Sequence, residues 1–141
     1  MSRRKGRIAA FQALYAWEAT AAPLDELLEF NWPQTAEAEE SKINAGTKTF
    51  ASLLVAGTIE NIQIIDEKIK ENLQHWDFSR LKRVDVAILR ISVYSLLFQP
   101  DIPPQVVMEE AVKISIEYGE DESFRFINGI LNTIKEKVCG K

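Results

Sequence analysis

The sequence predicts an all-α protein, a single compact domain of about seven helices in two small helical sub-bundles. Apolar residues recur at helical spacing along most of the 141 residues, and no segment alternates apolar and polar residues as a strand would. The most apolar segment, 84–98, ends at a cluster of prolines. Hydrophobic content of 46% and charged content of 27% are ordinary for a globular protein. We expect one domain over residues 1–141, with sub-bundles of about 1–76 and 77–141.

Residues 2–20 predict the first helix. Ser2 is a candidate cap. The apolar residues recur at helical spacing and define an expected buried face: Ile8, Phe11, Leu14, Tyr15 and Trp17. Arg3 and Arg7, one turn apart, share a face next to Arg4 and Lys5. Since cations at a helix N-terminus oppose the helix dipole, helix stability does not explain them.

The next segment predicts a short helix, a loop and a long helix. A leucine-rich stretch after Pro23 predicts the short helix, and Asn31–Lys42 predicts an acidic loop. Thr47 is the expected cap of the long helix, in which Gly57 marks a kink or a close contact with another helix. The apolar face of the long helix comprises Phe50, Leu54, Ile62, Ile65, Ile69 and Leu73.

The segment Val84–Phe98, VDVAILRISVYSLLF, predicts the central helix, preceded by one helical turn at Ser79–Arg83. Only Asp85, Arg90 and two serines interrupt its apolar residues, so almost every side must be buried. At about 22 Å of helical rise it is too short to span a bilayer, and the two charged residues within it also argue against a membrane span.

Two more helices are predicted after the prolines. In the helix Gln105–Tyr118 the expected buried side comprises Val106, Val107, Ala111, Ile114 and Tyr118. Gly119 is expected in the left-handed conformation that ends many helices. The last helix, Ser123–Val138, has an expected buried face of Ile130, Leu131 and Ile134 with either Phe126 or Ile127.

Charge is segregated along the chain. The sequence holds 17 basic and 21 acidic residues, a net charge of −4. Residues 1–17 carry four of the cations and no acid, which leaves 13 basic and 21 acidic residues, a balance of −8, in the rest. The basic N-terminal segment is therefore a candidate nucleic-acid contact, with a solvated basic tail as the alternative.

The sequence contains no recognisable catalytic or metal-binding constellation. Neither GxGxxG nor GxxxxGK[ST] occurs, and a single histidine, His75, with a single cysteine, Cys139, excludes the usual zinc clusters. Glu109 and Glu110 are adjacent on a helix and indicate a solvated face. We expect no enzyme activity and no cofactor. The lone cysteine and the absence of a signal-peptide apolar core indicate the cytoplasm.

The residues that stand out are suited to single-stranded RNA. The N-terminal cations could neutralise phosphates, and Ser123–Phe126 offers a helix N-terminus, a cation and two rings. Such RNA is commonly held by phosphate contacts combined with base stacking. Phe124 and Phe126 point to different sides of a helix, so at least one of them belongs to the core. Asn128 and Gly129 have close helix packing as their alternative explanation.

Three segments carry a family resemblance: RRKGRIAAFQALYAWE at the start, RVDVAILRISVYSL in the middle, and PPQVVMEEAVKISIEYG followed by SFRFINGIL. In order, spacing and total length, the chain resembles the NusB family of transcription antitermination factors. The resemblance implies two small helical bundles and a non-enzymatic RNA-binding factor. Such proteins pair with NusE, a ribosomal protein of the small subunit, and the pair binds single-stranded boxA RNA of ribosomal RNA transcripts. With other Nus factors, this lets RNA polymerase read through terminators.

The resemblance also implies which residues bind. One RNA-binding group comprises Arg3, Arg4, Lys5 and Arg7, and the other comprises Glu122, Ser123, Arg125, Phe126 and Asn128. The contact with NusE falls partly on Asp85, whose carboxylate is therefore expected to be exposed.

Two alternatives stay open. A related helical domain forms the RNA-binding part of some ribosomal RNA cytosine methyltransferases, but we expect no cofactor-binding α/β domain here because no glycine-rich loop occurs. The other alternative is a helical module that binds only proteins, or a homodimer built on exposed apolar surface, with a passive basic tail.

Overall fold

The computed structural model describes residues 3–29, 44–73 and 77–138, and all regular structure among them is helical. The α-helices are α1 (Arg3–Thr20), α2 (Leu24–Leu27), α4 (Ala45–Glu60), α5 (Ile62–Glu71), α6 (Arg83–Phe98), α7 (Pro104–Tyr118) and α8 (Ser123–Val138), and one 3-10 helix, η1, spans Phe78–Arg80. The all-α prediction is confirmed. The expectations for Ser2, His75, Cys139 and the Asn31–Lys42 loop lie outside the described residues.

Helix α1 buries one apolar face against α4 and α6. Phe11 and Leu14 are buried as predicted, whereas Tyr15 is 42% exposed, so its place in the predicted face is wrong. The reason is angular: Tyr15 lies one residue, about 100° of rotation, beyond Leu14. Trp17 is partly buried against the core.

The predicted long helix is two helices. Asn44 caps α4, because its side chain accepts a hydrogen bond from the Thr47 backbone N–H at 2.9 Å, so the prediction of Thr47 as the cap is wrong. The chain leaves helical geometry at Asn61, whose side-chain amide donates to the Gly57 carbonyl at 2.8 Å. The close-contact interpretation of Gly57 is confirmed, since a Cβ there would collide with the Tyr94 ring.

Helix α6 is the centre of the molecule, as predicted. Every residue from Asp85 to Leu96 is buried, and α6 packs against α1, α4, α5, α7 and α8. A segment surrounded by five helices has no solvent-facing side, which explains its nearly continuous apolar sequence. The turn expected just before it occurs slightly earlier, as η1.

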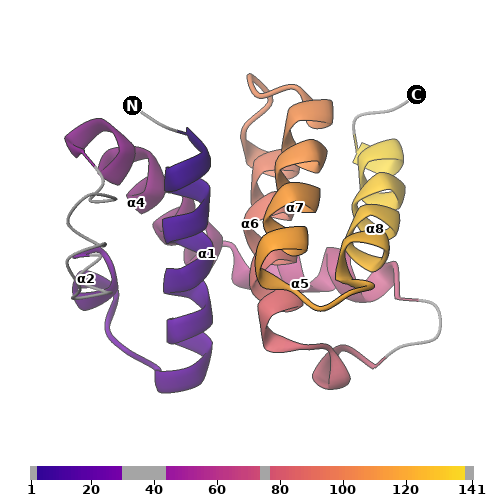
Figure 1. Cartoon of the computed structure of the whole chain (residues 1–141), viewed down its shortest axis with the longest axis horizontal. Coiled ribbons are helices and arrows are strands. Elements are labelled where there is room, and N and C mark those ends of the chain that lie inside the picture. Colours follow the sequence, from indigo (N-terminus) through magenta and orange to yellow (C-terminus); the bar gives the residue numbers. More distant parts are fainter. Residues whose placement is uncertain (1–2, 30–43, 74–76, 139–141) are drawn as a thin grey trace.

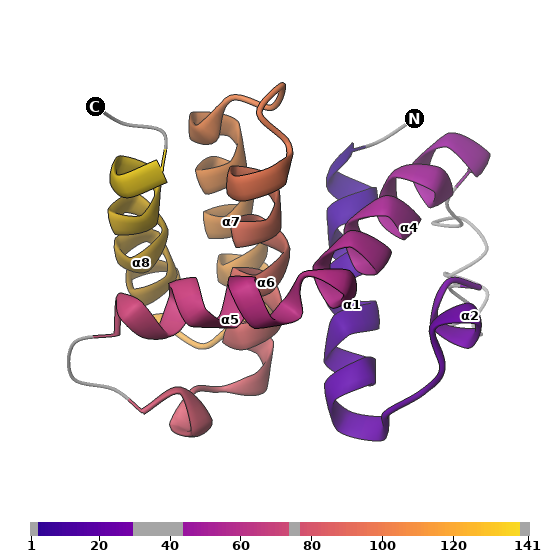
Figure 2. The ribbon, with the colours of Figure 1, turned by 180° about the vertical axis from the view of Figure 1, so that it is seen from behind.

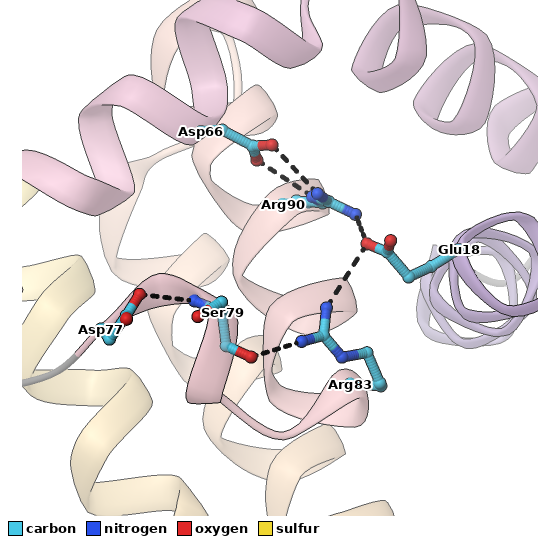
Figure 3. A network of polar contacts seen from close by, with 6 residues as sticks. All are labelled: Glu18, Asp66, Asp77, Ser79, Arg83 and Arg90. Carbon is cyan, nitrogen blue, oxygen red and sulfur yellow. Dashed lines mark hydrogen bonds and ion pairs between the residues drawn. The ribbon is translucent and has the colours of Figure 1, made fainter.

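The charged residue in the middle of α6 joins three helices (Figure 3). Arg90 makes two hydrogen bonds to Asp66 of α5, at 3.0 and 2.9 Å, and one to Glu18 of α1 at 2.6 Å. Burial by itself would lower the pKa of Arg90, but the hydrogen bonds and charges of Asp66 and Glu18 outweigh it and raise that pKa. Arg83 lies 3.8 Å from the same Glu18 carboxylate. A paired buried charge thus fixes how α1, α5 and α6 meet.

Helices α7 and α8 complete the fold with two corrections in α7. Val106 and Tyr118 are each 38% exposed, so their place on the predicted buried side is wrong, while Val107, Ala111 and Ile114 are buried. Both lie at the ends of α7, beyond the middle turns that face α6. In α8, Ile127 is the buried residue of the two candidates.

Gly119, the residue after α7, is not left-handed. Its φ of −93° and ψ of −175° are extended, so the predicted conformation is wrong. A Cβ at Gly119 would lie 2.7 Å from the Ser115 carbonyl oxygen and 2.8 Å from the Ser123 Cβ. Glycine is therefore required because the end of α7 and the start of α8 approach closely here.

The helices form a broad, flat arrangement (Figures 1 and 2). Helices α1, α2 and α4 occupy one end, while α6, α7 and α8 stand together at the other and α5 runs across the back, against α6 and α8. On the front, α1, α7 and α8 follow one another from left to right. The division into sub-bundles near residue 76 stays a prediction. Within the described ranges, no helix is long and apolar enough to cross a membrane.

Candidate nucleic-acid interface

The four N-terminal cations lie in the first turns of α1 but in different environments. Arg3, Arg4 and Lys5 are exposed, whereas Arg7 is buried, with 5% of its surface exposed. The guanidinium carbons of Arg3 and Arg7 lie 5.0 and 5.5 Å from the centre of the Phe50 ring, so these two side chains share a face, as predicted. Three of the four cations can therefore meet a phosphate directly.

Arg4 connects α1 to α7. Its Nε and Nη2 atoms donate to the two carboxylate oxygens of Glu110, both at 3.1 Å, and this partner raises the pKa of Arg4. Half of the Arg4 side chain stays exposed, at 49%, against 14% for Glu110. The interpretation of Glu110 as part of a solvated face is therefore wrong. Its partner comes from a helix about 100 residues away in sequence, which spacing within α7 could not reveal.

The surface continues from Arg4 across α7 to α8. Lys113, one turn after Glu110, lies 3.9 Å from the same carboxylate. Lys113 also lines a groove of about 510 Å³ between α7 and α8, together with Gln105, Asn128 and Lys135. Arg4, Lys113 and Asn128 thus link α1, α7 and α8, and we call the surface that these three residues mark the front face. Helix α7 therefore lies between the two predicted RNA-binding groups: its Glu110 pairs with Arg4, and its Lys113 lines the groove with Asn128.

The start of α8 contributes both exposed and structural residues. Glu122 and Arg125 are exposed and lie 3.7 Å apart. Asn128 is exposed in the groove, and Arg125 lies on the neighbouring turn of the same side. Ser123, in contrast, is buried, and its Oγ accepts a hydrogen bond from the Glu120 backbone N–H at 3.1 Å. Ser123 therefore holds the turn that positions its neighbours.

The two rings of this segment differ in their surroundings. Phe126 is half-buried and packs against the hydrophobic core. Phe124 is also half-buried but lies outside that cluster, and the guanidinium carbon of Arg125 lies 5.6 Å from the centre of its ring. Since Phe124 precedes Asn128 by one helical turn, it lies on the side of the groove. Phe124 is thus the better-placed ring for a base.

We expect Phe126→Ala to destabilise the protein by about 1–3 kcal/mol, below the range for a fully buried phenylalanine, because Phe126 is only half-buried. Phe124→Ala, which removes a ring outside the core cluster, should destabilise the protein less than Phe126→Ala and should weaken RNA binding instead. Urea unfolding and RNA titration of the two variants measure both effects. Equal destabilisation by the two substitutions would contradict the assignment of Phe126 to the core.

Asp85 is not exposed, so that expectation is wrong. It has 5% of its surface exposed because the first turn of α6 faces the start of α8, where Ser123 hydrogen-bonds to its side chain. Its Oδ1 atom has no hydrogen-bond partner among the described residues. Burial raises the pKa of Asp85, although Ser123 and Lys82 act in the opposite direction. A buried carboxylate with a vacant acceptor is suited to a donor from outside the chain.

The raised pKa of Asp85 makes the stability of the protein depend on pH. Because the folded state binds the Asp85 proton more tightly than the unfolded state, its stabilising contribution is present below the ordinary pKa and is lost as pH rises through the raised pKa. We therefore expect Asp85→Asn to gain stability relative to the wild type as pH rises from about 3.5 to 7. Denaturation of both proteins across this range measures the difference. A constant difference would show that the Asp85 pKa is not raised.

Three residues that line the groove were not predicted from the sequence. Lys113, Gln105 and Lys135 were not candidates, because each is an ordinary polar residue on a solvent-facing helix surface. The spacing of Asn128 and Lys135, seven residues apart, does place them on one side of α8. The groove itself requires α7 and α8 to be placed side by side.

Comparison with known proteins identifies close relatives of the whole chain. The sequence model of the NusB family matches residues 4–136. The transcription antitermination protein NusB of Treponema denticola is 47% identical over 137 residues, which cover 97% of this chain and 98% of that protein.

Solved structures give the same result. The structure of NusB from T. maritima superposes with a TM-score of 0.85 at 34% identity, covering 97% of this chain and 92% of that one. A crystal structure of the antitermination factors NusB and NusE in complex with double-stranded RNA contains a chain that superposes with a TM-score of 0.81 at 29% identity, covering 96% of both chains.

Proposed function

The chain belongs to the NusB family, and from this premise we propose that it is a transcription antitermination factor that binds RNA together with NusE. The solved complex of NusB and NusE with RNA, which contains a chain of the same fold, supports this proposal. We take boxA of ribosomal RNA transcripts as the RNA element and read-through by RNA polymerase, with other Nus factors, as the outcome. The protein acts in the cytoplasm, without catalysis or a cofactor.

The observation that carries this proposal is the front face of α1, α7 and α8. The chain has a net charge of −4, yet the start of α1 presents the exposed cations Arg3, Arg4 and Lys5, and Lys113 and Arg125 are exposed on α7 and α8. These cations favour binding of a polyanion at that face, while the acidic remainder of the protein disfavours it elsewhere. Because α7 joins the two groups, one strand of RNA can contact both.

Asp85 is the proposed contact with NusE. Its Oδ1, which has no hydrogen-bond partner within residues 3–29, 44–73 and 77–138, lies at the start of α6, and the same side chain is hydrogen-bonded to Ser123 at the start of α8. A cation or N–H group of NusE would complete this acceptor, and the Ser123 contact places the protein partner next to the RNA-binding segment. Binding of NusE and of RNA at adjacent sites explains why the two act as a pair.

An RNA titration with and without NusE tests the proposal. We expect the full chain to bind a single-stranded boxA oligonucleotide, more tightly when NusE is present, with an affinity that falls as salt rises. An oligonucleotide of the same length and scrambled sequence is the control. If neither mixture binds RNA, the chain is a protein-binding module and the proposal is wrong.

A further inference from the structure

A second hollow lies at the start of α1, apart from the groove between α7 and α8. Its volume is about 630 Å³, and residues of α1, α4 and the connection from α6 to α7 line it. Pockets that bind small molecules commonly measure about 300–1,000 Å³. Three apolar residues line it and stay exposed: Leu53 at 52%, Phe98 at 41% and Val106 at 38%. This exposed apolar wall is available to a ligand.

Arg7 gives the pocket a polar group. It lines the hollow together with Arg3, it is buried, and its Nη2 atom has no hydrogen-bond partner among the described residues. A buried N–H donor without an acceptor is energetically costly, so the protein carries a donor that a ligand oxygen would satisfy. The ring of Phe50 lies beneath both guanidinium groups and holds them at the pocket wall.

The remaining polar residue decides between ligand classes. Asp101 lines the same pocket and would repel the carboxylate of an acidic peptide, whereas it would accept a hydrogen bond from a ring N–H. A planar ring that carries both a keto oxygen and an N–H group suits Arg7, Asp101 and the apolar wall together. Uracil and guanine are the RNA bases with this pattern.

The pocket lies next to the exposed cations at the start of α1. Arg3 lines the pocket and is followed immediately by Arg4, which belongs to the front face. A strand whose phosphates contact these exposed cations therefore has a base within reach of the pocket.

We propose that this pocket binds one unstacked keto-bearing base, uracil or guanine, of the RNA strand that contacts the start of α1. The inference rests on the proposed RNA-binding function and specifies where that function reads a base.

Abasic substitution tests the pocket. Each nucleotide of the boxA oligonucleotide is replaced in turn by an abasic one, and its affinity for the full chain with NusE is measured. For the wild type, we expect one uracil or guanine position at which base removal weakens binding about tenfold, from lost stacking and hydrogen bonds. Exchange of that base for cytosine or adenine should weaken binding in the same direction.

Variants then place that base in the pocket. With Leu53→Ala and with Phe98→Ala, the abasic penalty at that position should shrink severalfold, because the base no longer has its wall. Ile64→Ala is the matched control: Ile64 is 48% exposed, close to the 52% of Leu53, and lies on α5 outside the pocket. It should keep the full penalty.

The other possible results contradict either the pocket proposal alone or both proposals. If wild-type protein binds RNA but no abasic position is sensitive to Leu53→Ala or Phe98→Ala, the pocket proposal is wrong and the proposed function stands. If an acidic peptide competes with RNA and loses its affinity on Phe98→Ala, the pocket serves a protein ligand. If the wild type binds no RNA with NusE present, both proposals are wrong.

Discussion

Replacing Arg90 by methionine should destabilise the folded chain by about 3–5 kcal/mol. The substitution keeps most of the side-chain volume but removes the partner of Asp66 and Glu18, whose side chains are 18% and 32% exposed. Loss of one member of a buried ion pair leaves the other charge without compensation. Urea-induced unfolding followed by circular dichroism measures the change in the free energy of unfolding.

Arg83→Met is the matched control. Arg83 lies 3.8 Å from the same Glu18 carboxylate, is 42% exposed and donates an exposed hydrogen bond to the Ser79 carbonyl at 2.9 Å, so its loss should cost only about 1 kcal/mol. The double substitution Arg90→Met and Asp66→Leu should recover part of the stability, since no unpaired charge at Asp66 is then left. Equal effects of Arg90→Met and Arg83→Met would contradict the role given to the buried network.

Replacing Arg4 by alanine should weaken boxA binding by about 1.5–3 kcal/mol, the usual value of a hydrogen bond to a charged group, or roughly ten- to hundredfold. The slope of log affinity against log salt should flatten by roughly 0.7, the value for one phosphate contact on a single strand. Titration with NusE at several salt concentrations measures both. An unchanged slope would mean that Arg4 contacts no phosphate.

The Arg4 substitution has a second effect, which needs its own control. It leaves the Glu110 carboxylate with Lys113, 3.9 Å away, as its remaining partner on the front face, where the less compensated negative charge repels RNA. Glu110→Gln alone should therefore strengthen binding, because it frees Arg4 and removes a negative charge. Adding Glu110→Gln to Arg4→Ala should restore part of the affinity but not the slope. This pair of variants separates the lost phosphate contact from the exposed carboxylate.

The sequence predicts the architecture well because helical periodicity and burial are strongly linked. The segment 84–98 is apolar on nearly every side, and the helix found there is surrounded by five others. The ends of helices are harder to predict from the sequence. Asn44 rather than Thr47 caps α4, and Gly119 is extended rather than left-handed, because a capping residue and a close approach depend on single contacts.

Only part of the candidate interface could be predicted from the sequence, because the rest depends on contacts between distant helices. The segregation of Arg3, Arg4 and Lys5 from the acidic remainder is a property of the sequence alone. That Arg4 meets Glu110, and that Arg7 is buried, depends on how α1 packs on α7 and α4. A periodic pattern shows which face of a helix is buried, but it does not show which charged residue of a distant helix lies opposite.

Cross-linking from RNA is the most direct test of the central claim, that one strand lies across α1, α7 and α8. The full chain with NusE is irradiated with boxA RNA that carries a photoreactive uracil at successive positions, and the linked peptides are identified. We predict that one strand links to both the start of α1, around Arg4, and the groove at Lys113 and Asn128. Cross-links confined to one of these regions, or found mainly on α5 at the back, would contradict the account.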